Sequence, residues 1–262
     1  MNRKQAIQNF AEQNLRGQGK LYIGTSGYSY SHWENGVFYP RGLPKLKQLE
    51  YYTNHFNTVE MNYPFYRLPS SKSFFHWKEV APKGFIFAVK VSRYITHIKY
   101  LYQCKDAWKT FFKRALCLKD KLGPFLFQLS PNWKKDPERL KNFLEMLEKN
   151  NKKHRYVFEF RHPSWFSEDV YQILKKYKNL SLCLADSPGW PFKEIITGDF
   201  IYIRFHGGKT LYTSNYTEKE LKNWAGKIKG YLKKGLDVYV YFNDDAMGFA
   251  VENAKTLKKL LT

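Results

Sequence analysis

The sequence predicts an α/β protein folded as a single (β/α)8 barrel of the TIM type, with its site at the C-terminal ends of the strands. Eight short apolar-aromatic runs each end in charged or amide residues, and segments of helical periodicity separate the runs. The chain has 262 residues, and a closed barrel needs about 250. The predicted strands are Leu21–Gly27, Thr58–Asn62, Phe85–Val91, Gly123–Gln128, Tyr156–His162, Ser181–Asp186, Phe200–His206 and Val238–Asp245.

Side-chain alternation separates polar from apolar residues along these strands. In the fifth run, Glu159 and Arg161 alternate with Phe158 and Phe160, and the second, seventh and eighth runs repeat the pattern. Successive side chains of a strand point to opposite faces. We therefore expect the polar set to face one interior and the apolar set to face covering helices.

The segments between the strands carry helical signals. The predicted helices are Leu43–Phe56, Ser70–Val80, Tyr100–Lys121, Asp136–Asn150, Ser167–Tyr177, Thr217–Lys234 and Ala246–Leu261. Thr217 and Glu220 have the spacing of a capping box, and Gly235 ends that helix. The short connection from Asp186 to Phe200 has room for one or two helical turns at most. No GxGxxG or GxxxxGK[ST] motif follows the first strand, which disfavours a dinucleotide-binding fold.

The chain reads as a polar N-terminal extension over residues 1–20 and one barrel domain over residues 21–262. The extension lacks the apolar stretch of a secretory signal, and no apolar run reaches the roughly 18 residues that span a bilayer. Cys104, Cys117 and Cys183 show no CxxC spacing and are typical of reduced intracellular thiols. We expect a cytoplasmic protein with no membrane partner.

The net charge of +21, from 44 Lys and Arg against 23 Asp and Glu, has two interpretations. Basic residues favour a partner that carries phosphates. Alternatively, the abundance of Lys, Asn, Tyr, Phe and Ile reflects an A/T-rich coding bias. The arginines are more informative, because Arg offers a planar fork that fits carboxylate or phosphate. Four of them lie at or just after strand ends: Arg67, Arg93, Arg161 and Arg204.

Four acids are predicted at strand ends on the interior parity: Glu60, Glu159, Asp186 and Asp245. Paired carboxylates serve as general acid and base or in glycoside cleavage, or they neutralise neighbouring arginines. With histidines of the same rim they also offer ligands for a divalent metal ion, although no HExxH-like spacing occurs. Lys90 points inward from the third strand, either as a Schiff-base nucleophile or as the partner of an acid such as Glu60.

The strand-end segments resemble the YecE-like family, catalogued as domain of unknown function 72, from about Leu21 to the C-terminus. The segments are GTSGYSYSHWENGVFYP, FNTVEMNYPFYRLP, FAVKVSRYITH, LGPFLFQLSP, FEFRHPSWF, YIRFHG and VYVYFNDDAMGFAVENA. The resemblance implies a TIM-type barrel without an established activity. Its layout is similar, by analogy, to metal-dependent endonucleases of the endonuclease IV type and to xylose isomerases, although fold does not fix function.

The resemblance also implies a set of motif positions. They are Glu60, Asn62, Lys90, Thr96, His97, Gln128, Glu159, Arg161, Trp165, Asp186, Arg204, His206, Asn243 and Asp245. This chain departs from the family pattern after the second strand, where the usual Asn-Ser-Thr-Phe-Tyr reads Asn62-Tyr63-Pro64-Phe65-Tyr66. Roles that need those hydroxyl groups are not carried over.

These observations favour an enzyme that binds a small anionic, phosphate-bearing substrate or a nucleic acid, and we expect phosphoester or phosphodiester hydrolysis with or without a divalent metal. The expected catalytic residues are Glu60, Glu159 and Asp245. The expected substrate-binding residues are Asn62, Lys90, His97, Gln128, Arg161, Trp165, Asp186, Arg204, His206 and Asn243. Two alternatives stay open: a glycoside- or sugar-processing enzyme, and a non-catalytic nucleic-acid or protein binding module that uses the lysine-rich exterior.

Overall fold

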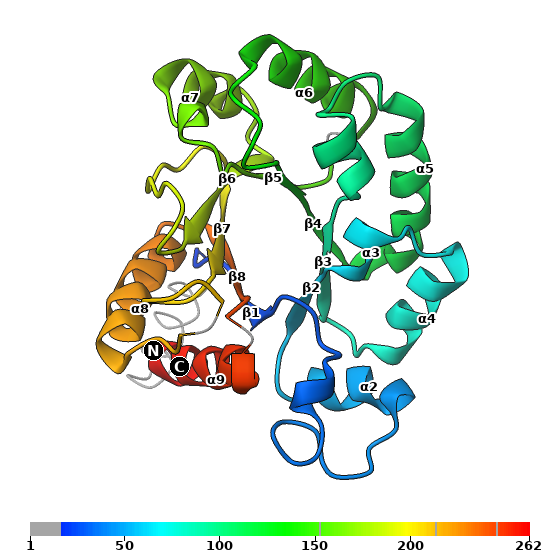
Figure 1. Cartoon of the computed structure of the whole chain (residues 1–262), viewed down its shortest axis with the longest axis vertical. Coiled ribbons are helices and arrows are strands. Elements are labelled where there is room, and N and C mark those ends of the chain that lie inside the picture. The colour runs from blue at the N-terminus through cyan, green and yellow to red at the C-terminus, as the bar shows by residue number, and fades with distance from the viewer. Residues whose placement is uncertain (1–16, 152, 213, 245) are drawn as a thin grey trace, which may run out of the picture.

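The computed structural model describes residues 17–262 apart from residues 152, 213 and 245 (Figure 1). Most of the predicted N-terminal extension, and Asp245, therefore lie outside the described residues. Eight strands pair in parallel in the order β1-β8-β7-β6-β5-β4-β3-β2 and form a nearly closed barrel, which confirms the predicted (β/α)8 fold. The strands are β1 (Leu21–Thr25), β2 (Thr58–Met61), β3 (Ile86–Lys90), β4 (Leu122–Gln128), β5 (Tyr156–Glu159), β6 (Leu180–Asp186), β7 (Phe200–Phe205) and β8 (Asp237–Phe242).

Helices surround the strands as an outer ring (Figure 1). They are α2 (Gln48–Thr53), α3 (Tyr63–Tyr66), α4 (Ser71–Val80), α5 (Lys105–Ala115), α6 (Pro137–Asn151), α7 (Glu168–Lys175), α8 (Glu218–Lys233) and α9 (Phe249–Leu261). The capping box at Thr217 is present, because its hydroxyl accepts from the Glu220 N–H and the Glu220 carboxylate accepts from the Thr217 N–H.

One predicted helix and the β6–β7 connection differ in detail from what the sequence suggests. The long Tyr100–Lys121 segment begins with a turn and only then forms α5, and it ends in a 3-10 segment, η4 (Leu116–Lys121), where Lys119 has φ of 52°. The β6–β7 connection, residues 187–199, is fully described and contains no helix, because it is short and includes Gly189 and Pro191.

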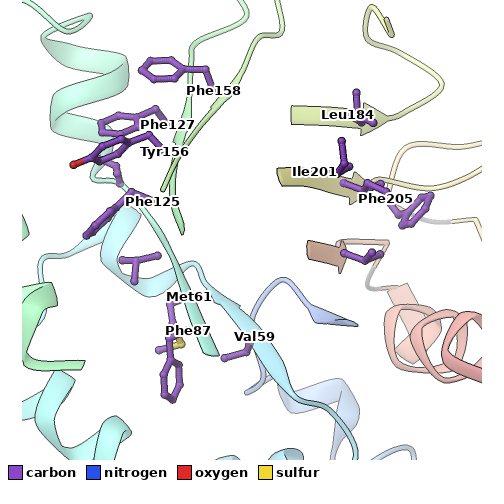
Figure 2. Close-up of a cluster of buried hydrophobic side chains, with 14 of the residues drawn as sticks. Val59, Met61, Phe87, Phe125, Phe127, Tyr156, Phe158, Leu184, Ile201 and Phe205 are labelled. Carbon is purple, nitrogen blue, oxygen red and sulfur yellow. The ribbon is translucent and has the colours of Figure 1, made fainter. Parts of the chain in front are cut away.

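The two strand parities fill two separate cores, as the alternation predicts. One parity packs outward against the helices, and Figure 2 shows members of this set, among them Phe125, Phe127 and Phe158. The Phe127 and Phe158 rings stack with centroids 5.0 Å apart. The other parity forms an interior cluster that includes Tyr202 and Tyr241. The polar strand-end residues other than Asp186 share this interior parity, so the fold directs them to one place.

Side chains close the barrel between β1 and β2, which pair in the backbone at an isolated bridge from Ser26 to Glu60. The Asn57 side chain accepts from the Ile23 N–H at 3.0 Å and donates to the Leu21 carbonyl at 2.8 Å. This amide therefore substitutes for the strand hydrogen bonds that the seam lacks.

The Tyr52 side chain also connects β1 and β2 across this seam, the junction between the two strands. Its hydroxyl accepts from the Thr25 N–H at 2.9 Å and donates to the Thr58 carbonyl at 3.1 Å. Gly24 allows this approach, since a Cβ there would lie 2.1 Å from the Thr58 carbonyl oxygen. The strands thus come together only because position 24 carries no side chain.

None of the helices in the described part of the chain is long and apolar enough to cross a membrane.

Candidate functional site

A fully buried ion network lies in the barrel interior at the C-terminal ends of the strands. Arg204 Nη1 lies 2.5 Å from Glu159 Oε2, and Arg204 Nη2 lies 2.8 Å from Glu60 Oε1. None of the three side chains has exposed surface. The Ser26 and Tyr202 hydroxyls donate to the two Glu60 oxygens at 2.5 Å and 2.7 Å. A single guanidinium therefore holds carboxylates from β2 and β5 together.

Glu159 and Arg204 are both charged at neutral pH. Burial alone raises the pKa of the Glu159 carboxyl, but the Arg204 and Arg161 guanidinium groups outweigh it and hold that pKa well below its usual range. The two carboxylates in turn keep the pKa of Arg204 high against the effect of burial. Burial and the nearby Arg204 hold the pKa of His206 far below its usual value, so this imidazole is neutral.

A cavity of about 1580 Å³ lies at the same end of the barrel. No Asp or Glu is among the described residues that line it. The basic and amide side chains of its lining are His32, Asn62, Lys72, His76, Lys90, Arg93, His97, Gln128, Arg161 and Asn243. Its aromatic side chains are Tyr28, Tyr30, Tyr63, Phe65, Tyr66, Trp77 and Tyr212. The lining therefore suits a molecule with negative charge and at least one flat, apolar part.

Arg161 connects the buried network to the cavity. Its Nε donates to Glu159 Oε1 at 2.8 Å, and its guanidinium carbon lies 3.6 Å from the centroid of the Trp190 ring. The Arg161 side chain is 12% exposed and Nη2 lies 3.5 Å from the Tyr212 hydroxyl. Contacts on two sides fix this guanidinium in the orientation that it presents to the cavity.

Lys90 is the last residue of β3 and is 8% exposed. Its Nζ lies 4.2 Å from the centroid of the Phe65 ring, a cation–π contact. No hydrogen-bond acceptor or ion-pair partner for Nζ occurs in the part of the chain that the structure describes. Burial and the charge of Arg204 lower the pKa of Lys90 to about 7, against a smaller opposite effect of Glu60 and Glu159.

His97 lies in η3 (Tyr94–Ile98), a single π-helical turn after β3. Its Nδ1 is 2.9 Å from the Thr96 hydroxyl, and its ring packs edge-on against Phe65 at 5.1 Å. Burial and the nearby Lys90 lower the pKa of His97 to about 4. The imidazole is therefore neutral at pH 7 and can accept or relay a proton.

The predicted site residues divide into a lining set and a buried set. Six line the cavity: Asn62, Lys90, His97, Gln128, Arg161 and Asn243. Four others form the ion network or touch it without lining the cavity: Glu60, Glu159, Arg204 and His206. Within the lining set, Asn62 Oδ1 is buried and has no hydrogen-bond partner among the described residues, so a donor on a ligand would satisfy it.

Besides Arg204 and His206 of the buried network, two further predicted substrate-binding residues, Trp165 and Asp186, do not line the cavity. Trp165 has no exposed surface, stacks on Phe160 at 4.8 Å, and donates its indole N–H to the Trp133 carbonyl at 2.7 Å. Asp186 accepts from the Trp224 indole N–H at 2.8 Å, and burial raises its pKa. Trp165 follows β5, and Asp186 is the last residue of β6. Asp186 is predicted on the interior parity, but it shares the parity of Leu182 and Leu184, which pack outward against the helices.

The strand ends alone do not predict several lining residues, among them Lys72, His76 and Tyr212. Lys72 and His76 reach the cavity from α4, which the sequence presents simply as a covering helix. Their spacing of four residues places them on one helical face, and the buried Phe74 lies between them in sequence. Tyr212 comes from the connection after β7, where it has φ of 61° and donates its N–H to the His206 carbonyl. No periodic signal marks that connection.

The described residues include no group of three His, Cys, Asp or Glu side chains arranged to hold a metal ion. Glu60 and Glu159, which the sequence offers as ligands, already share the positive charge of Arg204. This donor set does not fit a divalent cation.

A family model described as "Protein of unknown function DUF72" matches residues 22–262. The chain belongs to the DUF72 family. This confirms the resemblance that the strand-end motifs indicate.

Relatives and solved structures of the family cover most of the chain. The UPF0759 protein YunF of Bacillus subtilis (strain 168) is 25% identical over 271 aligned residues, which cover 92% of this chain and 94% of that protein. The UPF0759 protein YecE of Escherichia coli (strain K12) is 28% identical over 148 residues, 56% of this chain and 51% of that protein. The crystal structure of a DUF72 family protein from Thermotoga maritima MSB8 has a TM-score of 0.80 and 30% identity, and covers 92% of this chain and 99% of its own.

Proposed function

We propose that this DUF72 protein is an enzyme whose barrel mouth binds a small anionic, phosphate-bearing molecule and cleaves its phosphoester bond. One observation carries the proposal: Lys90 and Arg161 line one cavity whose described lining contains no Asp or Glu, and Glu159 binds Arg161 only through Nε. Charge-assisted hydrogen bonds from such groups are the strong contacts of phosphate sites.

Arg161 has the geometry of a prepared anion site. The Arg161 Nε–H donates to Glu159, and the guanidinium lies against the Trp190 ring. These two contacts set the direction of the N–H groups on Nη1 and Nη2. A guanidinium held in this way loses little freedom when a phosphate binds. Glu159 therefore acts on a ligand through Arg161, as a positioning residue.

The aromatic walls fit the rest of the ligand. Tyr63 is 52% and Tyr66 is 70% exposed, and both line the cavity next to the buried Phe65. Exposed aromatic rings at a basic site stack on bases and other flat groups. Mononucleotides, which combine a phosphate with such a ring, are accordingly the first class to test.

Proton transfer falls to groups that face the cavity. Lys90 has a pKa of about 7, where a general acid or base works best at neutral pH. Glu60 and Glu159 stay bound to Arg204 and keep the arginines in place. Asp245, the third acid that the sequence offers, lies outside the described residues.

The sugar-processing alternative is less well supported. A glycosidase needs two carboxyl groups that flank the scissile bond. Here Glu60 and Glu159 face a shared guanidinium, and neither lines the cavity.

Binding is tested by isothermal titration of inorganic phosphate and of mononucleotides into the wild-type chain, Arg161→Gln and the exposed control Lys229→Gln. We expect Arg161→Gln to weaken binding at least about tenfold, since a hydrogen bond to a charged group contributes about 1.5–3 kcal/mol. The control should bind as the wild type does. Release of phosphate from the nucleotides and of p-nitrophenol from bis(p-nitrophenyl) phosphate tests the cleavage.

The titration also separates the remaining possibilities. Equal affinity of wild type and Arg161→Gln would place anion binding outside the cavity. A third outcome is an affinity that falls steeply with salt, that Lys229→Gln lowers and that Arg161→Gln leaves unchanged. This outcome would identify a nucleic-acid binding module on the exterior. Binding in the cavity without phosphate release would reject the cleavage.

A further inference from the structure

Among the described basic groups of the cavity, Lys90 has surroundings that point to covalent chemistry. The side chain leaves β3 on the interior parity, and its Nζ rests against the Phe65 ring at 4.2 Å. It is 8% exposed and lines the cavity. The amine is thus desolvated by its neighbours and still open to a molecule in the cavity.

The acids nearest to Lys90 do not neutralise it by contact. Glu60 is held by Arg204, Ser26 and Tyr202. Glu159 is held by Arg204 and Arg161, and neither Glu forms an ion pair with Lys90. The ammonium form therefore has no acceptor in the described chain, whereas the neutral amine needs none.

We propose that Lys90 is a nucleophile that forms a Schiff base with an aldehyde or ketone, so that the substrate is a phosphate-bearing carbonyl compound. This inference rests on the proposed function for the phosphate contact and goes beyond it in naming the reacting group. The phosphate would lie on Arg161, and the carbonyl carbon would lie at Nζ. Desolvation of a lysine in an apolar pocket is a known way to activate it for this chemistry.

The step balances with water as the only by-product. The Nζ lone pair adds to the carbonyl carbon, the carbon–oxygen double bond opens, and the nitrogen proton passes to that oxygen. The resulting carbinolamine takes up a proton and expels water, which leaves an iminium ion. Nothing is oxidised or reduced, and hydrolysis by water reverses the sequence.

The iminium ion also gives a route to phosphoester cleavage. It acidifies the C–H bond beside the former carbonyl carbon. Loss of that proton to water expels a phosphate bonded to the next carbon, and the departing oxygen keeps the electron pair of the broken C–O bond. This route needs no activated water and no exposed carboxylate.

Borohydride trapping tests the inference on the whole protein. Pyridoxal 5′-phosphate serves as a probe because it combines an aldehyde, a ring and a phosphate. The protein is treated with the probe at pH 7, reduced with borohydride and digested, and mass spectrometry then measures labelling at each lysine. Lys229, exposed and outside the cavity, is the internal reference.

We expect Lys90 to be labelled at least about tenfold more than Lys229. At pH 7 about half of the Lys90 amines are neutral, against fewer than about one in a thousand for an ordinary lysine. Inorganic phosphate should protect Lys90 and leave Lys229 unchanged. Pyridoxal, which lacks the phosphate, should label Lys90 less, and Lys90→Arg should lose one adduct from the intact mass.

Labelling of Lys90 at or below the level of Lys229 would overturn the inference, whether or not the variant folds. If titration still shows phosphate bound through Arg161, the proposed function survives that failure. Strong labelling of Lys90 that is equal for pyridoxal and unaffected by phosphate would overturn the phosphate-bearing substrate class and count against the proposed function as well.

Discussion

Arg204 Nη1 and Glu159 Oε2 lie 2.5 Å apart in the barrel interior, and neither side chain has exposed surface. The same Glu159 binds Arg161 through its other oxygen. One buried carboxylate therefore couples a structural arginine to the arginine that faces the cavity, and the stability of the barrel and the shape of its site depend on the same atoms.

Replacing Arg204 by Met should strongly destabilise the protein. Glu60 and Glu159 would remain buried without their shared cation, and breaking a buried pair in this way costs about 3–5 kcal/mol. Urea unfolding followed by circular dichroism measures the loss. The control, Lys222→Gln, breaks the exposed pair with Glu218 and should leave the midpoint nearly unchanged.

A second substitution checks the cause. Adding Glu159→Gln to Arg204→Met removes one of the stranded charges and should recover part of the stability. A double variant that is less stable than Arg204→Met alone would contradict the buried-charge explanation.

The stability effect of Lys90 should depend on pH between about 7 and 10.5. The folded-state pKa is about 7 against an ordinary value of 10.5, so in that range the unfolded chain binds a proton that the folded chain does not. Stability that depends on Lys90 therefore rises with pH across this window. Lys90→Met should be more stable than wild type at pH 6 to 7, and this advantage should shrink toward pH 10.

Urea midpoints of both proteins over this pH range measure the effect. The difference between the two curves is the relevant quantity, because groups common to both cancel. A constant difference from pH 6 to pH 10 would show that Lys90 keeps an ordinary pKa.

Trp165→Phe should affect stability and spare ligand binding. The substitution removes the indole hydrogen bond to the Trp133 carbonyl, worth about 1 kcal/mol, and shrinks a side chain that is fully buried. The urea midpoint should fall, while the phosphate affinity should match that of wild type. A lower phosphate affinity of the folded variant would show that Trp165 takes part in ligand binding.

Tyr52→Phe should loosen the seam between β1 and β2. It removes the hydroxyl that bonds the Thr25 N–H and the Thr58 carbonyl, and a buried polar group left unpaired costs about 1–3 kcal/mol. Hydrogen exchange should increase first at the Thr25 amide. Tyr102→Phe, which removes an exposed hydroxyl, is the control. Equal exchange in the two variants would show that Asn57 alone closes the seam.

The sequence alone determined the barrel, its parity and the identity of most polar residues at its mouth. Side-chain alternation is a local property of a strand, so the shared face of Glu159 and Arg161 follows from their spacing and does not depend on the neighbouring strands. The eightfold repetition of strand and helix likewise needs no tertiary information. The motifs fixed the family by the same local means.

Tertiary structure decided which of these residues face the cavity and which support it. Pairing of Arg204 with Glu60 and Glu159 joins three strands distant in sequence, and it places two of the expected catalytic carboxylates in a buried network that does not line the cavity. The sequence could not reveal that the Trp165 ring packs against the Trp133 ring, or that His76 of α4 lines the cavity. The physical reason is that burial and charge pairing depend on the distances between segments that are far apart in the chain. A sequence shows directly only the spacing of residues within one segment.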